Sequence, residues 1–127
     1  MRKAKKEDME IIEDMMGMLF PDADIQHKED DVYLLAEKKG FPVGFCHLRF
    51  RESSCYIVGL GVLPEFRAHG IGSMLMERAL AMIDRKGVRT TTLKVSAINT
   101  AASLYVKFGF YERKYGQTLI LVRKQSN

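Results

Sequence analysis

The sequence has few cysteines, no tryptophan and only three prolines. Its two cysteines, Cys46 and Cys55, form no CxxC pair, so neither a disulfide framework nor a four-ligand zinc site can be built from them. We expect two free, buried thiols in a reducing cytoplasm. The three histidines lie far apart with no metal-ligand spacing, so we expect no metal.

Long apolar runs and a strong charge excess are also missing. No run approaches the roughly 18 residues that a membrane-spanning helix needs. The basic residues at positions 2–6 are followed by Glu7 and Asp8, which argues against a secretory signal. A net charge of +4 is too weak and scattered to indicate nucleic-acid binding. We therefore expect a cytoplasmic protein with neither a membrane nor a nucleic-acid partner.

The chain of 127 residues, 46% of them hydrophobic, is long enough for one domain, which we place at 1–127. Periodicity and turn residues predict helices over 9–19, 71–86 and 100–108, with Asp8 capping the first. They predict strands over 2–6, 32–37, 42–50, 55–63, 90–95, 110–115 and 117–123. The strand–helix–strand order from 55 to 95 implies a parallel pair, so we expect a mixed α+β sheet with helices on both faces.

The strand at 55–63 carries Gly59 and Gly61 in its second half. Glycine weakens a strand interior, so it usually marks a bulge or a place where another group approaches the backbone. Pro64 ends the strand.

The segment Arg67-Ala68-His69-Gly70-Ile71-Gly72 joins this strand to the longest helix. The N-terminus of a helix presents unpaired N–H groups and positive partial charge, and glycines let these groups close around an anion. With Arg67 as a further donor, the segment predicts a pyrophosphate site. It lacks the Gly-Lys-Ser/Thr of a P-loop and the third glycine of a dinucleotide fold. An ordinary glycine-bearing turn is the alternative.

The stretch from Val62 to Leu75 resembles the acetyl-CoA motif of the GNAT superfamily of N-acetyltransferases. A second stretch, Leu104-Tyr105-Val106-Lys107-Phe108-Gly109-Phe110, resembles the LYxxxGF phrase that ends the family core. The resemblance covers nearly the whole chain. It implies a sheet of six to seven strands that splays between the fourth and fifth, and acetyl-CoA as co-substrate.

The resemblance also implies roles for individual residues. Tyr105 matches the tyrosine that protonates the leaving thiolate, which suits a phenol because it is a donor at neutral pH. The backbone of the bulged strand would pair with the pantetheine arm, and Asn99 would contact the cofactor or fix its loop. The expected cofactor-binding residues are Leu60, Gly61, Val62, Arg67, Ala68, His69, Gly70, Ile71, Gly72, Ser73 and Asn99.

Three features depart from the family pattern. The two positions at which members carry a glutamate general base read Val58 and Lys94. Leu104 follows Asn99 by one residue fewer than usual, which shortens the loop. A water relay could replace the glutamate, with candidates that each also have an ordinary structural reading: His47, Glu52, Tyr33 and Tyr56.

The segment 20–31, which in the family covers the acceptor site, is brief. We expect an acceptor groove that is open, suiting a peptide or protein amine, or one that a partner chain completes in a homodimer. An acidic cluster there could attract a cationic amine or could be a solvated loop: Asp22, Asp24, Glu29, Asp30 and Asp31.

The expected function is direct transfer of an acetyl group from acetyl-CoA to a primary amine through a ternary complex. The alternative is a GNAT-fold module that binds coenzyme A without acetylating, since neither usual glutamate is present. An acetyl-cysteine intermediate is disfavoured because nothing near Cys46 or Cys55 resembles a nucleophile with its base. The sequence leaves the acceptor amine open.

Overall fold

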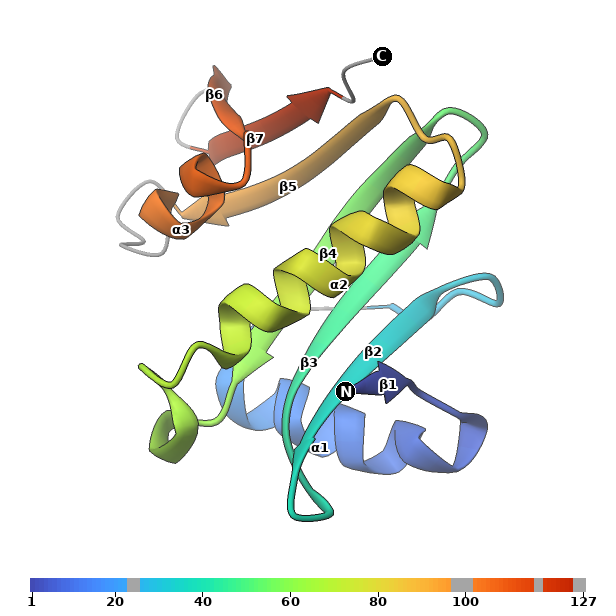
Figure 1. Ribbon diagram of the computed structural model, residues 1–127, viewed down its shortest axis with the longest axis vertical. Coiled ribbons are helices and arrows are strands. Elements are labelled where there is room, and N and C mark those ends of the chain that lie inside the picture. Colours follow the sequence, from blue (N-terminus) through green and yellow to red (C-terminus); the bar gives the residue numbers. More distant parts are fainter. Residues whose placement is uncertain (23–25, 97–101, 116–117, 125–127) are drawn as a thin grey trace.

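A single sheet of seven strands, in the order β1-β2-β3-β4-β5-β7-β6, runs through the computed structural model (Figure 1). The structure describes residues 1–22, 26–96, 102–115 and 118–124. All neighbouring strands are antiparallel except β4 and β5, which are parallel as the sequence predicts. The strands are β1 Arg2–Lys3, β2 Val32–Lys38, β3 Phe41–Phe50, β4 Ser54–Val62, β5 Thr90–Ser96, β6 Tyr111–Tyr115 and β7 Thr118–Lys124.

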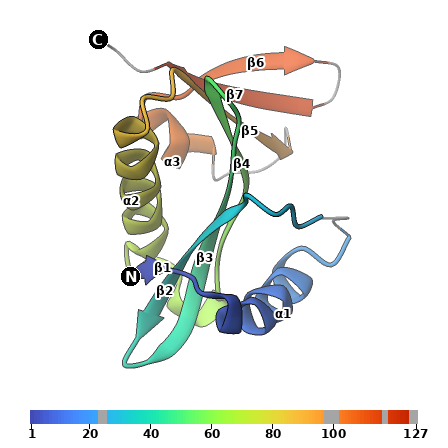
Figure 2. The ribbon, with the colours of Figure 1, turned by 90° about the vertical axis from the view of Figure 1, so that its right-hand side faces the viewer.

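The helices lie on both faces of this sheet, which confirms the expected mixed α+β architecture. Helix α1 covers one face, while α2 and α3 cover the other (Figure 2). Two short 3-10 turns, η1 and η2, precede α1 and α2. Their bounds are η1 Lys6–Asp8, α1 Met9–Leu19, η2 Pro64–Phe66, α2 Ile71–Arg85 and α3 Ala102–Lys107.

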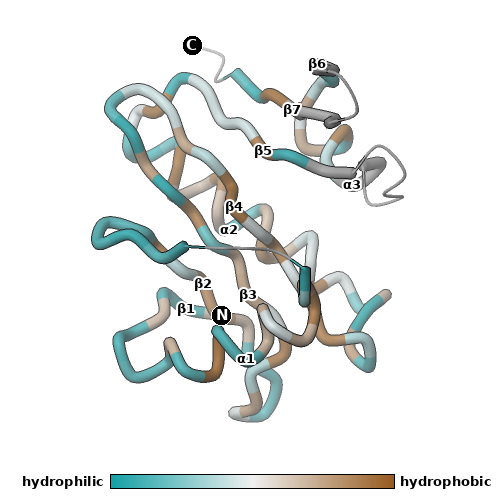
Figure 3. The backbone as a smooth tube through the Cα atoms, turned by 180° about the vertical axis from the view of Figure 1, so that it is seen from behind, coloured by the Kyte–Doolittle hydropathy of each residue, from teal (hydrophilic) through white to brown (hydrophobic). Residues whose placement is uncertain are grey.

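Each face has its own apolar cluster, because successive strand residues point to opposite faces. On the α1 face the cluster consists of Ile12, Met15, Met16, Tyr33, Leu35 and Phe45. The larger cluster on the α2 face includes Leu75, Met76, Ala79, Ile83, Cys46, Leu48, Cys55, Ile57 and Leu93. Hydrophobic residues accordingly follow the central strands, whereas the segment leading into β2 is hydrophilic (Figure 3).

The N-terminus departs from the sequence prediction. The first strand is only Arg2–Lys3, and Asp8 makes no side-chain cap to α1. The Asp8 carboxylate instead accepts from the guanidinium of Arg2, at 2.7 and 3.0 Å, and from the backbone N–H of Lys5 at 2.7 Å. The hydrogen bond from Arg2 contributes most to lowering the Asp8 pKa to about 2. The Asp8 carboxylate therefore holds the segment that contains Arg2 and Lys5, and it does not cap the helix.

The expected irregularity of β4 is a bulge at Val58. His47 of β3 lies opposite Gly59, but Leu48 lies opposite Ile57, so Val58 is one residue extra. The extra residue shifts the alternation of side chains by one position. Ile57 and Leu60 therefore both pack with the α2-face cluster, although residues three apart in a regular strand point to opposite faces.

Candidate active site

Strands β4 and β5 separate at the bulge. Their parallel pairing covers only Ser54–Ile57 against Thr90–Leu93, while β4 continues to Val62 and β5 to Ser96. Figure 1 shows the two strands diverging. Beyond Ile57, the edge of β4 that faces β5 therefore has no strand partner. Such an edge offers backbone N–H and C=O groups to an extended ligand.

Leu60, Gly61 and Val62 lie on this unpaired stretch and are held from the other side by β3. Gly61 faces α1: a Cβ there would lie 2.7 Å from Cδ1 of Leu19 and 3.0 Å from the ring of Phe45. The close packing of α1 is thus sufficient reason for glycine at this position.

The segment after β4 leads to the N-terminus of α2 through two left-handed residues, Ala68 (φ 65°) and Gly70 (φ 79°). Gly70 is the N-cap and makes no side-chain cap, and the first turn of α2 holds no acidic residue. The first helical hydrogen bond runs from the N–H of Met74 to the carbonyl of Gly70, at 3.0 Å. The amides of Ile71, Gly72 and Ser73 precede that bond and form a positive helix end.

Arg67 adds a formal charge to this end. Its Nε donates to the carbonyl of Val62 at 3.0 Å, which holds the side chain beside the end of β4. None of the ion pairs within the described residues uses Arg67. The residues expected to hold pyrophosphate, including the exposed His69, thus begin after η2 and run without a gap into the first turn of α2.

Tyr105 lies on α3 and is 7% exposed, in the α2-face cluster. Its ring and that of Phe110 form a T-shaped pair at a centroid distance of 6.1 Å. Burial, with a smaller contribution from Cys46, raises the pKa of the phenol, so it keeps its proton over a wide pH range. Asn99, the last of the expected site residues, lies outside the described residues.

The two positions that would carry a glutamate are both at the separation point. Val58 is the bulge residue itself. Lys94 is exposed and follows Leu93, the last residue of β5 paired with β4. Because Leu93 is buried on the α2 face, Lys94 points to the α1 face.

A buried polar cluster lies beside the bulge, and the sequence did not predict that its residues come together. Nε2 of His47 lies 2.7 Å from the carboxylate of Asp31, which also accepts from Arg49 at 3.0 and 2.9 Å. The side chain of Asp31 is only 1% exposed, and that of His47 is fully buried. Burial acts to raise the Asp31 pKa, but the bonds from Arg49, the Lys28 amide and His47 outweigh it, so the pKa lies well below its usual range.

His47 is held mainly as the neutral imidazole, because burial lowers its pKa. Its Nδ1 is buried without a hydrogen-bond partner among the described residues. Tyr33 stacks on the ring at 4.2 Å, and the Tyr33 hydroxyl is hydrogen-bonded to Nδ1 of His27. His47 and Arg49 alternate along β3, and this two-residue spacing was the signal in the sequence that they share a face.

The other expected groups take different places. Glu52 is exposed in the turn between β3 and β4, and Tyr56 is half-buried with its pKa raised by burial. The acidic cluster is not uniform: Asp31 is buried and paired, so it is unavailable to a cationic amine, whereas Glu29 and Asp30 are exposed. Asp24 lies outside the described residues.

Cys46 and Cys55 are free and buried, as expected. Burial raises the pKa of both thiols, that of Cys55 to about 12, which works against a thiolate nucleophile. Among the described residues, no group of three or more His, Cys, Asp or Glu side chains could hold a metal ion. None of the helices there is long and apolar enough to span a membrane.

The separated strands β4 and β5 and the uncapped N-terminus of α2 together characterise a class of fold. Comparisons with known proteins identify the family to which this chain belongs. The model of the acetyltransferase (GNAT) family matches residues 3–110, and the chain belongs to this family. A curated relative, the putative [ribosomal protein bS18]-alanine N-acetyltransferase of Bacillus subtilis, is 32% identical over 78 residues, covering 61% of this chain and 52% of the relative. The chain spans about half the length of the first curated relatives it matches.

Solved structures agree. The PaiA N-acetyltransferase from Thermoplasma acidophilum in complex with coenzyme A is 26% identical, with a TM-score of 0.71 over 76% of this chain and 62% of that one. The ribosomal-protein-S18-alanine N-acetyltransferase from Escherichia coli is 18% identical, with a TM-score of 0.83 over 98% of this chain and 92% of that one. The latter likeness extends the fold to nearly the full chain.

Proposed function

We propose that this protein transfers the acetyl group of acetyl-CoA directly to a primary amine, within a ternary complex. The observation that carries the proposal is the continuity of two binding elements: the unpaired edge of β4 after Ile57 and the uncapped N-terminus of α2. A strand-like edge suits the amide-bearing pantetheine arm, and a positive helix end suits a pyrophosphate. Acetyl-CoA supplies the activated thioester.

The residues of the chain then divide the binding work. The backbone of Leu60, Gly61 and Val62 pairs with the pantetheine arm. The pyrophosphate falls to the segment after it, consisting of Arg67, Ala68, His69, Gly70, Ile71, Gly72 and Ser73. Asn99 contacts the cofactor or fixes the loop in which Asn99 itself lies.

Tyr105 acts as the general acid. When the amine attacks the thioester carbonyl and the carbon–sulfur bond breaks, the thiolate needs a proton, and the protonated phenol of Tyr105 supplies it. The phenolate then regains the proton that the amine nitrogen releases as it becomes the amide. Its burial keeps the proton in place until the thiolate forms.

The lack of a carboxylate at positions 58 and 94, which hold Val58 and Lys94, limits the class of amine that can serve as acceptor. Without a base at the separation point, the amine must arrive with its proton already lost. At pH 7.5 about a quarter of an N-terminal α-amine of pKa about 8 is neutral, but only about one in a thousand of lysine side chains of pKa about 10.4. We infer that the acceptor is an α-amine, and that a relay through His47 and Asp31 is not needed for it.

The acceptor side is open. The connection between α1 and β2 holds no helix in its described residues, 20–22 and 26–31, and the Asp31 side chain is turned inward. An open groove suits a peptide or protein terminus, and a second copy completing it is the alternative. The free, buried thiols fit a reducing compartment such as the cytoplasm.

A panel of amines incubated with acetyl-CoA tests the proposal, read by free-thiol release and by the mass of the product. We expect thiol release that depends on the amine and favours α-amino peptides over lysine side chains near neutral pH. Tight binding of acetyl-CoA without thiol release for any amine would instead indicate a module that only binds the cofactor.

A further inference from the structure

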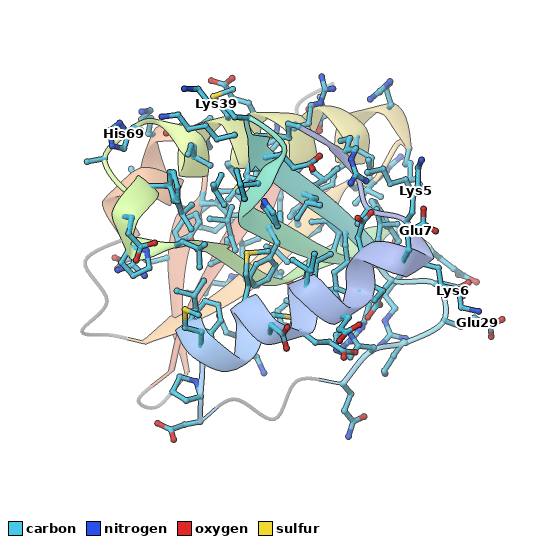
Figure 4. The ribbon with its side chains drawn as sticks, turned by 90° about the horizontal axis from the view of Figure 1, so that it is seen from below. Lys5, Lys6, Glu7, Glu29, Lys39 and His69 are labelled. Atoms are coloured by element: carbon cyan, nitrogen blue, oxygen red, sulfur yellow. The ribbon has the colours of Figure 1, made fainter. Side chains whose placement is uncertain are left out.

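A pocket of about 290 Å³ lies between the N-terminal segment and the segment that enters β2. Lysines from both segments line it: Lys3, Lys5, Lys6 and Lys28. Figure 4 shows Lys5 and Lys6 at the end of the molecule opposite His69, which belongs to the proposed pyrophosphate segment. The pocket is therefore separate from the cofactor site.

Two of the acidic groups nearby, Asp31 and Asp8, are already engaged. Asp31 lines the pocket, but its carboxylate is bound by Arg49 and His47. Asp8, next to the pocket, is bound by Arg2. Glu29 is the one other acidic residue in the lining. None of the four lysines takes part in an ion pair within the described residues, so a positive excess is left at the pocket.

The walls of the pocket are fixed by hydrogen bonds. The backbone N–H of Ala4 donates to the carbonyl of Tyr33 at 2.7 Å, which ties the N-terminal segment to β2. The backbone N–H of Lys28 donates to the buried carboxylate of Asp31 at 3.0 Å, which ties the opposite wall. A frame that is ordered beforehand reduces the entropy lost when a ligand binds.

A row of residues across the sheet gives the distance between the pocket and the separation point. Tyr33 lines the pocket, lies opposite His47 in the register, and His47 lies opposite Gly59 at the bulge. Tyr33 and the bulge are thus two strand spacings apart, about 10 Å. The exposed Lys94 lies at the separation point on the same α1 face, whereas α2 and α3 cover the other face (Figure 2).

We propose that this lysine-lined pocket binds an acidic group of the acceptor. An extended peptide advances about 3.3 Å per residue, so with its amine at the bulge it places its third or fourth residue at the pocket. The expected acceptor is a polypeptide whose N-terminal amine is followed, two to three residues later, by an aspartate or glutamate. Only the identity of the amine rests on the proposed function; the binding of the acidic group does not.

The size of the pocket favours a single carboxylate over a nucleic-acid backbone. The lysines surround one hollow instead of forming a stripe along an element, and the two aromatic rings in the lining, His27 and Tyr33, already stack on His47.

Calorimetry with short peptides tests this inference. Two hexapeptides with a free N-terminus differ only in carrying glutamate or glutamine at the third and fourth positions. We expect the glutamate peptide to bind about tenfold more tightly at low salt, with the difference shrinking as salt screens it. The combined variant Lys5→Gln, Lys6→Gln, Lys28→Gln should remove that preference. The matched control Lys39→Gln, an exposed lysine in the β2–β3 turn far from the pocket, should keep it.

Three results would overturn the inference. These are equal affinity for the two peptides, an equal loss in Lys39→Gln, or stronger binding of a single-stranded oligonucleotide that displaces the peptide. Acetyl-CoA affinity and thiol release measured on the same samples report separately on the proposed function. A retained preference for the glutamate peptide without any thiol release would support the peptide-binding pocket and contradict the proposed acetyl transfer.

Discussion

Tyr105 retains its proton in the pH range where an α-amine becomes neutral, because burial raises the pKa of the phenol. At the scale of the residue, the proposed site depends on protonation states: a phenol kept neutral, a lysine at the position expected for a base, and a histidine kept uncharged beside the bulge. The first two could be predicted from the sequence by motif, at Tyr105 and Lys94. The pairing of His47 with Asp31 could not, because the two residues meet only when β2 and β3 align.

Replacing Tyr105 by phenylalanine removes the proposed proton donor while keeping the ring that contacts Phe110. We expect kcat to fall about 100-fold or more, with the affinity for acetyl-CoA within about twofold of wild type. Tyr111→Phe, which alters an exposed tyrosine on β6, is the matched control. Unchanged turnover in Tyr105→Phe would rule out the general-acid role.

Replacing Asp31 by asparagine breaks the buried contacts to Arg49 and His47. We expect a loss of about 2 to 4 kcal/mol in the free energy of unfolding near neutral pH, measured by urea denaturation. Because the folded pKa of Asp31 lies below its usual 3.8, this stabilisation is complete above pH 3.8 and is lost as the pH falls toward the folded pKa.

The gap in stability between wild type and Asp31→Asn should therefore stay nearly constant above pH 3.8 and narrow as the pH falls below that value. Asp30→Asn changes an exposed neighbour and should leave stability nearly unaltered at every pH. A gap that stays constant as the pH falls below 3.8, or an equal loss in Asp30→Asn, would show that Asp31 is not held as a buried anion.

At the scale of the element, strand β4 combines three features in nine residues: a parallel pairing, a bulge and an open edge. Its glycines predict an irregularity but not its register, because the bulge falls at Val58, before both of them. The strong helices at Met9–Leu19 and Ile71–Arg85 agree closely with their periodicity. The prediction that the Asp8 side chain caps α1 was wrong, because the Asp8 carboxylate is bound by Arg2, six residues earlier in the sequence.

Gly61→Ala tests how tightly α1 packs on β4. The added Cβ would meet Leu19 at 2.7 Å and Phe45 at 3.0 Å, so we expect a loss of about 1 to 3 kcal/mol in the free energy of unfolding. Gly59→Ala is the matched control on the same strand, where the nearest atom is 3.8 Å away, and it should be nearly neutral. Equal effects in the two variants would contradict the packing account.

At the scale of the whole molecule, the two proposed binding sites lie in different parts of the fold. His69, just before α2, lies at one end of the molecule, and Lys5 and Lys6, which line the pocket, lie at the other end (Figure 4). The motif from Val62 to Leu75 predicts the first site, because its residues are contiguous in the sequence. No motif predicts the second, because Lys5 and Lys28 come together only through the hydrogen bonds of the folded chain.

Hydrogen–deuterium exchange with and without acetyl-CoA tests the central claim most directly. The account predicts slower exchange in the peptides that contain Val58–Val62 and Ile71–Ser73 when acetyl-CoA is present, because the ligand occupies the open edge and the helix end. Exchange in the paired strand β2 should stay unchanged. Protection that appears elsewhere, with the amides of β4 after Ile57 unaffected, would contradict the placement of the cofactor between β4 and β5.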